Sequence, residues 1–379
     1  MTKKWWSGAW QTALCLICAL LGSIQPASGA DFWVYIGTYT RATSKGVYLF
    51  KLDTDSGSLT PQGLAAAADD PCFLAIAPGE KYLYACATAN NHRDGVIDAF
   101  TINPTNGTLQ LVNEQPSGGD GPTQIAINPD GKCAAVANYS SGSVALLPIG
   151  TDGKLALPSS VIQHTGSSIN KSRQQSPHPH SCNFDSSGKF IFVPDLGIDK
   201  IAVYQCDDQK LTLLDPVPVA PGSGPRHMAF SPDGKFAYLI NEMAGTVITY
   251  ALNGGTLKQL QTISTLPENF HGTNTAAEVA VHPNGRFVYA SNRGNDSIAI
   301  FAVDPAAGTL SLIGFQSTLG KGPRMFAIDP TGNFLIAANQ NSDNVVLFRI
   351  DPKTGKLTAT GTTFTVSSPV CVTFLADRN

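Results

Sequence analysis

The sequence predicts an all-β protein, a seven-bladed β-propeller whose ring is closed by the C-terminal strand joining the N-terminal blade. Short apolar runs rich in β-branched and aromatic residues alternate with tight turns, as at 228–230, 236–240 and 246–250. The two ends of the chain carry complementary parts of one such unit. A turn of the type Pro-Asp-Gly-Lys also recurs with a period near 50 residues, its glycine falling at positions 131, 188, 234, 285 and 332.

Taken in order, the chain begins with an incomplete unit. Residues 33–64 read as the second, third and fourth strands of a blade that lacks a first strand, and residues 368–377 read as a first strand with nothing after it. Joined, they complete a seventh blade and remove an exposed sheet edge. Residues 31–379 are therefore expected to form one propeller domain. Six complete units are predicted to begin near Cys72, Thr123, His180, Arg226, Ala277 and Arg324.

A second turn motif supports the same repeat. It begins with Asp or Asn, ends in Gly-x-Leu and follows the predicted third strand of a blade, which is typical of a hairpin into an outermost strand. It occurs at residues 53–59, 103–109, 304–310 and 351–357.

Residues 1–30 are predicted to be a secretory signal peptide. Lys3 and Lys4 form a basic start, residues 13–21 form a short apolar stretch, and small residues follow at positions 27–30. The apolar stretch is short for a membrane span. We expect a secreted or periplasmic protein that is released from the membrane, with a retained N-terminal anchor as the alternative.

The composition excludes several partners. Only 14% of residues are charged and the net charge is −3, so no overall basic field attracts nucleic acid. The six cysteines after residue 30 show no Cys-x-x-Cys spacing, and we expect neither a metal site nor a cofactor.

One polar insertion, residues 164–180, precedes a first strand and is predicted to form a flap over one mouth of the ring.

The functional residues are predicted where the repeats differ. In a propeller the start of each first strand and the end of each second strand lie at the same mouth. The asparagine that repeatedly ends the second strand suits a structural role, whereas its neighbours differ between blades. The first register contains Thr123, His180, Arg226, Ala277 and Arg324. The second contains Tyr139, Leu196, Glu242, Arg293 and Gln340.

These registers predict a site for a small anionic molecule. Arginine holds carboxylate or phosphate through charge-assisted bonds, and His or Glu can move protons near neutral pH. His180 and Glu242 are the catalytic candidates. The substrate-binding candidates are Arg226, Arg293, Arg324, Tyr139 and Gln340.

Alternative roles are open for several of these residues. Arg324 and Arg293 could each form a structural ion pair with a Glu from a neighbouring blade instead of binding substrate. His227 lies one step off the channel register, so we expect it to point into the packed sheets. Glu278 is also one step off, beside the mouth, where it could orient an arginine.

Five segments together resemble the family of seven-bladed propeller lactonases, which contains bacterial 6-phosphogluconolactonases and fungal 3-carboxy-cis,cis-muconate lactonising enzyme. The segments are His178-Pro-His-Ser, Gly224-Pro-Arg-His, Asn241-Glu, residues 278–293 and Ile36-Gly-Thr-Tyr-Thr. The resemblance covers the whole chain after residue 30.

The resemblance implies a catalytic histidine at His180, a substrate-binding arginine at Arg226, an acid/base carboxylate at Glu242 and a second arginine at Arg293. We expect metal-independent hydrolysis of an anionic sugar or organic-acid lactone by general acid/base chemistry. A muconate-lactonising cycloisomerase and a non-catalytic exported propeller that binds a ligand or protein are the alternatives. The export signal leaves the substrate open, because the phosphorylated sugar lactone is a cytosolic metabolite.

Overall fold

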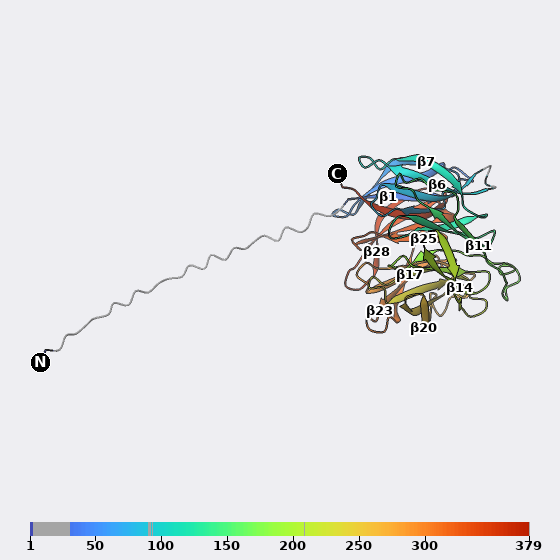
Figure 1. Ribbon diagram of the computed structural model, residues 1–379. Helices are drawn as coiled ribbons and strands as arrows, with labels where there is room; N and C mark the ends of the chain where they lie inside the picture. Colours follow the sequence, from blue (N-terminus) through green and yellow to red (C-terminus); the bar gives the residue numbers. More distant parts are fainter. Residues whose placement is uncertain (3–30, 90–91, 93, 208, 379) are drawn as a thin grey trace.

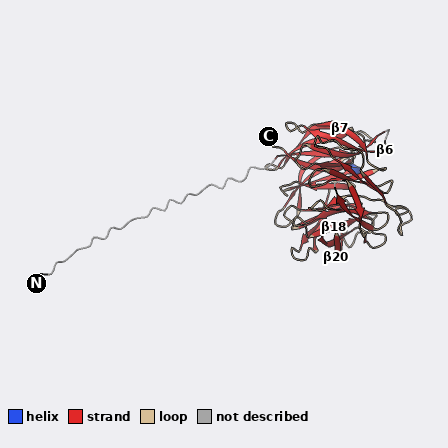
Figure 2. Cartoon of the chain, viewed as in Figure 1, coloured by secondary structure: helices blue, strands red, loops and turns tan. Residues whose placement is uncertain are grey.

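Seven antiparallel sheets form the ring of the computed structural model, which describes residues 1–2, 31–89, 92, 94–207 and 209–378 (Figure 1). Residues 3–30, most of the predicted signal peptide, lie outside the described residues. The one helix in the described part of the chain is the short 3-10 turn η1 (Gln340–Ser342) (Figure 2). No helix among the described residues is long and apolar enough to cross a membrane.

Each sheet is one blade, numbered here along the chain. Blade 1 contains β29 (Pro369–Ala376), β1 (Asp31–Thr38), β2 (Gly46–Asp53) and β3 (Ser58–Ala67). Blade 2 contains β4 (Phe73–Ile76), β5 (Tyr82–Ala89), β6 (Asp94–Ile102) and β7 (Leu109–Pro116). Blade 3 contains β8 (Pro122–Ile127), β9 (Cys133–Asn138), β10 (Ser143–Pro148) and β11 (Ser160–Gln163).

The remaining blades follow the same order from the channel outward. Blade 4 contains β12 (Asn183–Phe184), β13 (Phe190–Asp195), β14 (Lys200–Asp207), β15 (Lys210–Leu213) and β16 (Val217–Pro218). Blade 5 contains β17 (Pro225–Phe230), β18 (Phe236–Asn241), β19 (Thr246–Asn253) and β20 (Thr256–Ser264). Blade 6 contains β21 (Thr275–Val281), β22 (Phe287–Arg293), β23 (Ser297–Val303) and β24 (Leu310–Ser317). Blade 7 contains β25 (Pro323–Ile328), β26 (Phe334–Asn339), β27 (Asn344–Ile350) and β28 (Leu357–Thr365).

The predicted closure of the ring is confirmed. β29 pairs antiparallel with β1, so that Phe32 lies opposite Ala376. The strand pairing removes the free edge that the N-terminal blade would otherwise expose. The three strands predicted around residues 228–250 are also confirmed as β17, β18 and β19.

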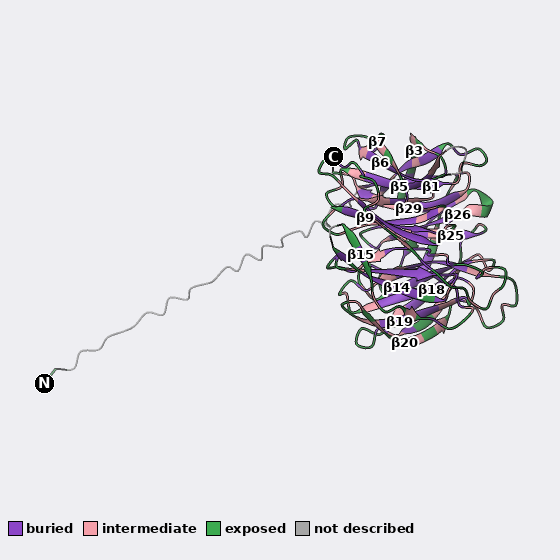
Figure 3. Ribbon diagram, turned by 45° about the vertical axis from the view of Figure 1, so that its right-hand side comes forward, coloured by how far each residue is buried: buried purple, intermediate pink, exposed green. Residues whose placement is uncertain are grey.

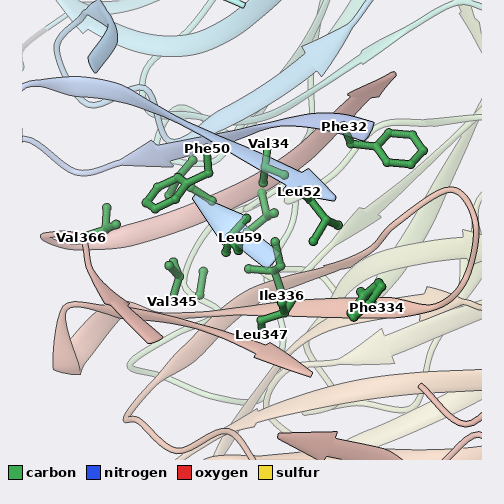
Figure 4. Packing of buried hydrophobic residues seen from close by; sticks show 13 residues of the cluster. Phe32, Val34, Phe50, Leu52, Leu59, Phe334, Ile336, Val345, Leu347 and Val366 are labelled. Atoms are coloured by element: carbon green, nitrogen blue, oxygen red, sulfur yellow. The ribbon is translucent and has the colours of Figure 1, made fainter. Parts of the chain in front are cut away.

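The core is divided among the contacts between neighbouring blades. Seven buried apolar clusters lie between successive blades, and the one between blades 7 and 1 contains Val34, Phe50, Ile336 and Leu347 (Figure 4). Middle strands are covered on both faces, which explains why residues 133–137 of β9 are all small and apolar. Outer strands such as β20 alternate in exposure, and exposed residues gather at the ring's margins (Figure 3).

Tyrosines connect successive blades through the second turn motif. Tyr289 Oη donates a hydrogen bond of 2.8 Å to the carbonyl oxygen of Gly355 in the next blade. That glycine has a φ of 71°, and a Cβ there would meet Phe287 at 2.5 Å. The glycine is therefore required both by its backbone conformation and by the neighbouring blade. The equivalent pairs are Tyr35 with Gly107 and Tyr238 with Gly308, and Tyr84 makes the same bond to Gly153, in a turn that departs from the motif.

Candidate active site

A β-bulge marks the start of the first strand in most blades. Two residues there oppose one residue of the second strand. This breaks the alternation of side chains along the strand and changes the direction in which the bulged side chains point. The bulged residues are Val370 in blade 1, Thr123 in blade 3, Arg226 in blade 5, Ala277 with Glu278 in blade 6, and Arg324 in blade 7.

The second register is held to the first by a repeated backbone hydrogen bond. The N–H of Glu242 donates to the carbonyl of Gly224, two residues before Arg226, at 2.7 Å. Tyr139, Leu196 and Gln340 make the corresponding bond in their blades. The two predicted registers therefore meet at one mouth of the channel, as expected from the antiparallel pairing.

A chamber of about 430 Å³, measured as volume open to the centre of a water molecule, occupies this mouth. His180, Glu242, Arg293, Arg324 and Tyr139 all contribute to its wall. His180 and Glu242 thus face one cavity. Two predicted residues are not in the wall: Arg226 lies in a smaller cavity beneath the chamber, and Gln340, where η1 begins, does not line the chamber.

Glu242 is the centre of a cluster of guanidinium groups. Its Oε2 accepts from Arg293 Nη2 at 2.9 Å and from Arg226 Nε at 3.1 Å, and its Oε1 accepts from Arg173 Nη2 at 2.7 Å. Burial alone would raise the pKa of Glu242, but the charges of Arg293, Arg226 and Arg173 lower it to about 2. The carboxyl is therefore ionised at neutral pH. The ion-pair role considered for Arg293 is confirmed, Arg226 forms such a pair as well, and the same role considered for Arg324 was wrong among the described residues.

Arg324 differs from the other arginines of the cluster. It makes no ion pair with any acidic residue in the part of the chain that the structure describes. Its guanidinium carbon lies 5.6 Å from the ring centroid of Tyr39, whose other neighbour Arg41 lies at 5.5 Å. An arginine that faces a chamber without a carboxylate partner is suited to hold an anionic ligand.

His180 lies between the bridge at Pro179 and the start of β12, with its side chain 3% exposed. Its ring packs edge-on against Tyr139 at 5.4 Å between centroids. Burial lowers the pKa of His180 well below its usual value, and the charges of Arg226 and Arg324 act in the same direction. The imidazole is therefore neutral near pH 7 and can accept a proton.

The insertion at residues 164–180 contributes a residue that the sequence analysis missed. Arg173 reaches the chamber and bonds both Glu242 and, at 3.3 Å, the hydroxyl of Tyr139. The insertion is fixed at its base, where His164 Nδ1 lies 2.6 Å from Asp195 Oδ2. The insertion occurs in one blade, so Arg173 has no equivalent position in the other blades. A comparison of blades therefore could not predict it.

Tyr39 was also missed, although a signal existed. Its N–H donates to the carbonyl of Ser368 at 3.1 Å, the same bond that Glu242 makes with Gly224. Tyr39 therefore belongs to the second register, in the blade built from both ends of the chain. Extending the register across the closure would have identified it.

The expectation for His227 was wrong, and the bulge explains why. His227 lines the cavity beneath the chamber instead of pointing into the packed sheets. Glu278 lines the same cavity, whose wall also contains Arg226 and Arg324, so a role in orienting an arginine stays a prediction. His227 Nδ1 lies 2.9 Å from Glu278 Oε2. The extra residue at each bulge turns the next side chain into the channel, so a strict two-residue period fails at this point.

Fold and site together define a seven-bladed propeller with an arginine-rich chamber that contains a neutral histidine and an ionised carboxylate. Residues 33–374 match the family described as lactonase, 7-bladed beta-propeller. The chain therefore belongs to the seven-bladed propeller lactonases, as the resemblance implied, and its class of activity is lactone hydrolysis.

Individual relatives agree with this membership. The chain is 38% identical to a 6-phosphogluconolactonase of Bacillus subtilis over 343 residues, covering 90% of this chain and 97% of the relative. It is also 38% identical over 302 residues to a 6-phosphogluconolactonase of Formosa agariphila, covering 78% and 85%. The solved structure of a periplasmic gluconolactonase from Pseudomonas aeruginosa matches with a TM-score of 0.86 and 36% identity, covering 92% and 99%.

Proposed function

We propose that the protein hydrolyses the lactone of a sugar acid, with His180 as the proton-transfer group and the arginines of the chamber as anion-binding groups. One observation carries the proposal: a neutral histidine and an arginine without a carboxylate partner line the same chamber. The names of the relatives support glucono-δ-lactone and its 6-phosphate as candidate substrates.

In the proposed reaction, His180 removes a proton from the attacking water as the water oxygen bonds to the lactone carbonyl carbon. Arg293 lines the chamber and offsets the charge that develops on the carbonyl oxygen. The ring C–O bond then breaks, and the imidazolium of His180 returns the proton to the leaving alkoxide. No other acid is required.

Glu242 has a different role in this proposal from the acid/base role expected from the sequence. A carboxyl with a pKa of about 2 has no proton to donate at neutral pH. Both of its oxygens are already bonded by arginines. We therefore assign Glu242 to holding Arg173, Arg226 and Arg293 in place, and Arg324 to binding the anionic or hydroxylated end of the substrate.

Proton release from glucono-δ-lactone and from 6-phosphoglucono-δ-lactone tests the proposal, measured above the spontaneous rate with the purified protein. We expect acceleration with at least one lactone and its loss in His180→Asn. The wild-type melting temperature should be nearly retained in that variant. A protein that accelerates neither lactone would favour the binding-only alternative. A His180→Asn variant with full turnover would refute the assignment of proton transfer to His180.

We also propose that residues 1–30 direct export, so that the protein acts outside the cytoplasm. The basic start and short apolar stretch support this proposal. N-terminal sequencing after expression in a Gram-negative host tests it. Cleavage near residue 30 with recovery from the periplasm is expected, whereas an intact N-terminus in the cytosol would contradict export.

A further inference from the structure

A second, much smaller cavity lies beneath the chamber on the channel axis. Its volume open to the centre of a water molecule is about 10 Å³, close to what one water molecule requires. Most of the residues in its wall are polar or charged, namely Thr123, His180, Arg226, His227, Glu278 and Arg324. His180 lies in the walls of both cavities, as do Cys72, Thr123 and Arg324.

Two buried ring nitrogens at this cavity have no hydrogen-bond partner among the described residues. They are Nδ1 of His180 and Nε2 of His227. The two rings lie 5.0 Å apart between centroids and are inclined at 66°. Leaving a buried polar nitrogen unsatisfied costs about 1–3 kcal/mol. A water molecule that bonds to both nitrogens removes this cost at both residues.

Glu278 fixes the protonation of His227. The carboxylate lies 2.9 Å from His227 Nδ1, so Nδ1 carries the hydrogen and donates it. The other carboxylate oxygen accepts from the N–H of Val279 at 3.2 Å. Burial lowers the pKa of His227 against the raising effect of Glu278, so the ring is neutral and its Nε2 is an acceptor.

We propose that Glu278 and His227 position His180 through one water molecule bound in this small cavity. The water donates to His227 Nε2 and accepts from Nδ1–H of His180. His180 Nε2 is then free of hydrogen and available to the chamber as a base. Glu278 and His227 are positioning residues, because neither lines the chamber that receives the substrate.

The arrangement also stabilises the charge that forms during turnover. This inference rests on the proposed function, in which His180 Nε2 takes a proton from the attacking water and returns it to the leaving alkoxide. The imidazolium forms near Arg226, Arg293 and Arg324, all of which disfavour it. The carboxylate of Glu278 offsets this repulsion through the chain of hydrogen bonds, and Nδ1 keeps its hydrogen throughout.

The charge of Glu278 is tested with Glu278→Gln, which keeps the shape and an acceptor for His227. We expect kcat on the lactone that the wild type hydrolyses to fall about 10- to 100-fold, as when a histidine loses its outer partner, with KM nearly unchanged. The acid limb of kcat/KM should move to lower pH, because removal of a nearby anion lowers the pKa of His180. Unchanged kcat with an unmoved limb would overturn the proposal.

The tautomer of His180 provides a readout that does not depend on activity. Nitrogen-15 NMR of histidine-labelled protein should show hydrogen on Nδ1 of His180 in the wild type. His227→Phe keeps a ring but removes the acceptor, and we expect the hydrogen to redistribute towards Nε2. The same tautomer in both proteins would overturn the proposal even if Glu278→Gln were too unstable to assay.

His282→Phe is the matched control for the loss of a buried histidine. His282 Nε2 bonds the carbonyl of Gly332 at 2.8 Å in the next blade, outside both cavities. This variant should lower the melting temperature without moving the acid limb or the tautomer. If His180→Asn is inactive while Glu278→Gln and His227→Phe behave as wild type, the relay is wrong and the proposed function stands. Full turnover in His180→Asn would instead refute the proposed function.

Discussion

At the scale of single residues, the charge of Glu242 contributes to the stability of the fold. Its pKa falls from 4.5 to about 2 on folding. Because the folded pKa is depressed, the contribution is complete above about pH 4.5 and is lost as pH falls towards 2. It is on the order of 3 kcal/mol by linkage.

We predict that Glu242→Gln lowers the free energy of unfolding at pH 7 by about 3–5 kcal/mol, since the buried Arg226 loses its carboxylate. Urea unfolding from pH 7 to pH 2.5 measures this, and the variant should lose less further stability below pH 4.5 than the wild type. Glu268→Gln, at an exposed carboxyl, is the control. Equal stability of Glu242→Gln and this control at pH 7 would contradict the ion-pair assignment.

Arg324 is predicted to affect substrate affinity more than stability. In Arg324→Gln, KM for an anionic lactone should rise about tenfold or more, because a charge-assisted bond contributes about 1.5–3 kcal/mol. The melting temperature should change little, since no described carboxylate loses a partner. Steady-state kinetics measure the effect, with Arg286→Gln, an exposed arginine outside the chamber, as the control. A selective fall in kcat alone would assign Arg324 to the transition state instead.

His180, Glu242 and Arg293 were predictable as residues of the chamber because blades that otherwise repeat differ at those positions. Arg226 was predictable as a partner of Glu242 but not as a residue beneath the chamber. His227 and Glu278 were not predictable, since a bulge adds one residue to one strand without leaving a recognisable motif. The distinction depends on backbone hydrogen bonding, which the pattern of side chains does not report.

At the scale of secondary-structure elements, hydrogen bonds from tyrosine connect the blades. Tyr289→Phe removes the donor to Gly355 and leaves a buried carbonyl without it. We predict a loss of about 1 kcal/mol in the free energy of unfolding. Tyr250→Phe is the matched control, because the Tyr250 hydroxyl is buried with no partner among the described residues. Equal losses in both variants, measured by urea unfolding, would show that the blade-to-blade bond contributes nothing.

The turns within blades were more predictable than the tyrosine hydrogen bonds that join one blade to the next. The repeated glycines marked the hairpins because the backbone there has positive φ, for example 69° at Gly107 and 77° at Gly332. The use of the same turns as acceptors for the next blade was not visible. Partners such as Tyr84 and Gly153 are 69 residues apart in the sequence, and only the stacking of blades brings them together.

At the scale of the whole molecule, closure of the ring depends on β29. Ending the chain after residue 367 removes this strand and takes Cys371 and Leu375 from the cluster between blades 1 and 2. It also exposes the edge of β1. We predict loss of the folded protein, seen as aggregation in size-exclusion chromatography. A control chain ending at Asp377 loses the exposed Arg378–Glu80 ion pair and should fold normally. A protein that elutes as the full chain does and keeps its melting temperature after the longer truncation would contradict the importance of closure.

The number of blades was predictable from the repeat length of about 50 residues and from the two incomplete units at the ends of the propeller. The arrangement of the chamber did not, because it depends on Arg173 from an insertion that has no counterpart in other blades. The sequence repeat therefore predicted the propeller. Differences between repeats predicted site residues only at positions that every blade has.

The pairing of β1 with β29 also separates the order of synthesis from the order of assembly. β1 leads the propeller in chain order and pairs with β29 at its other end, so six blades are synthesised before the blade that these two strands share can form. Chaperones that hold unfolded chains would therefore be needed longest at β1. The same pairing places the two ends of the propeller side by side. A circular permutation that opens the chain at another loop between blades would therefore keep the finished ring and leave a different strand to pair last.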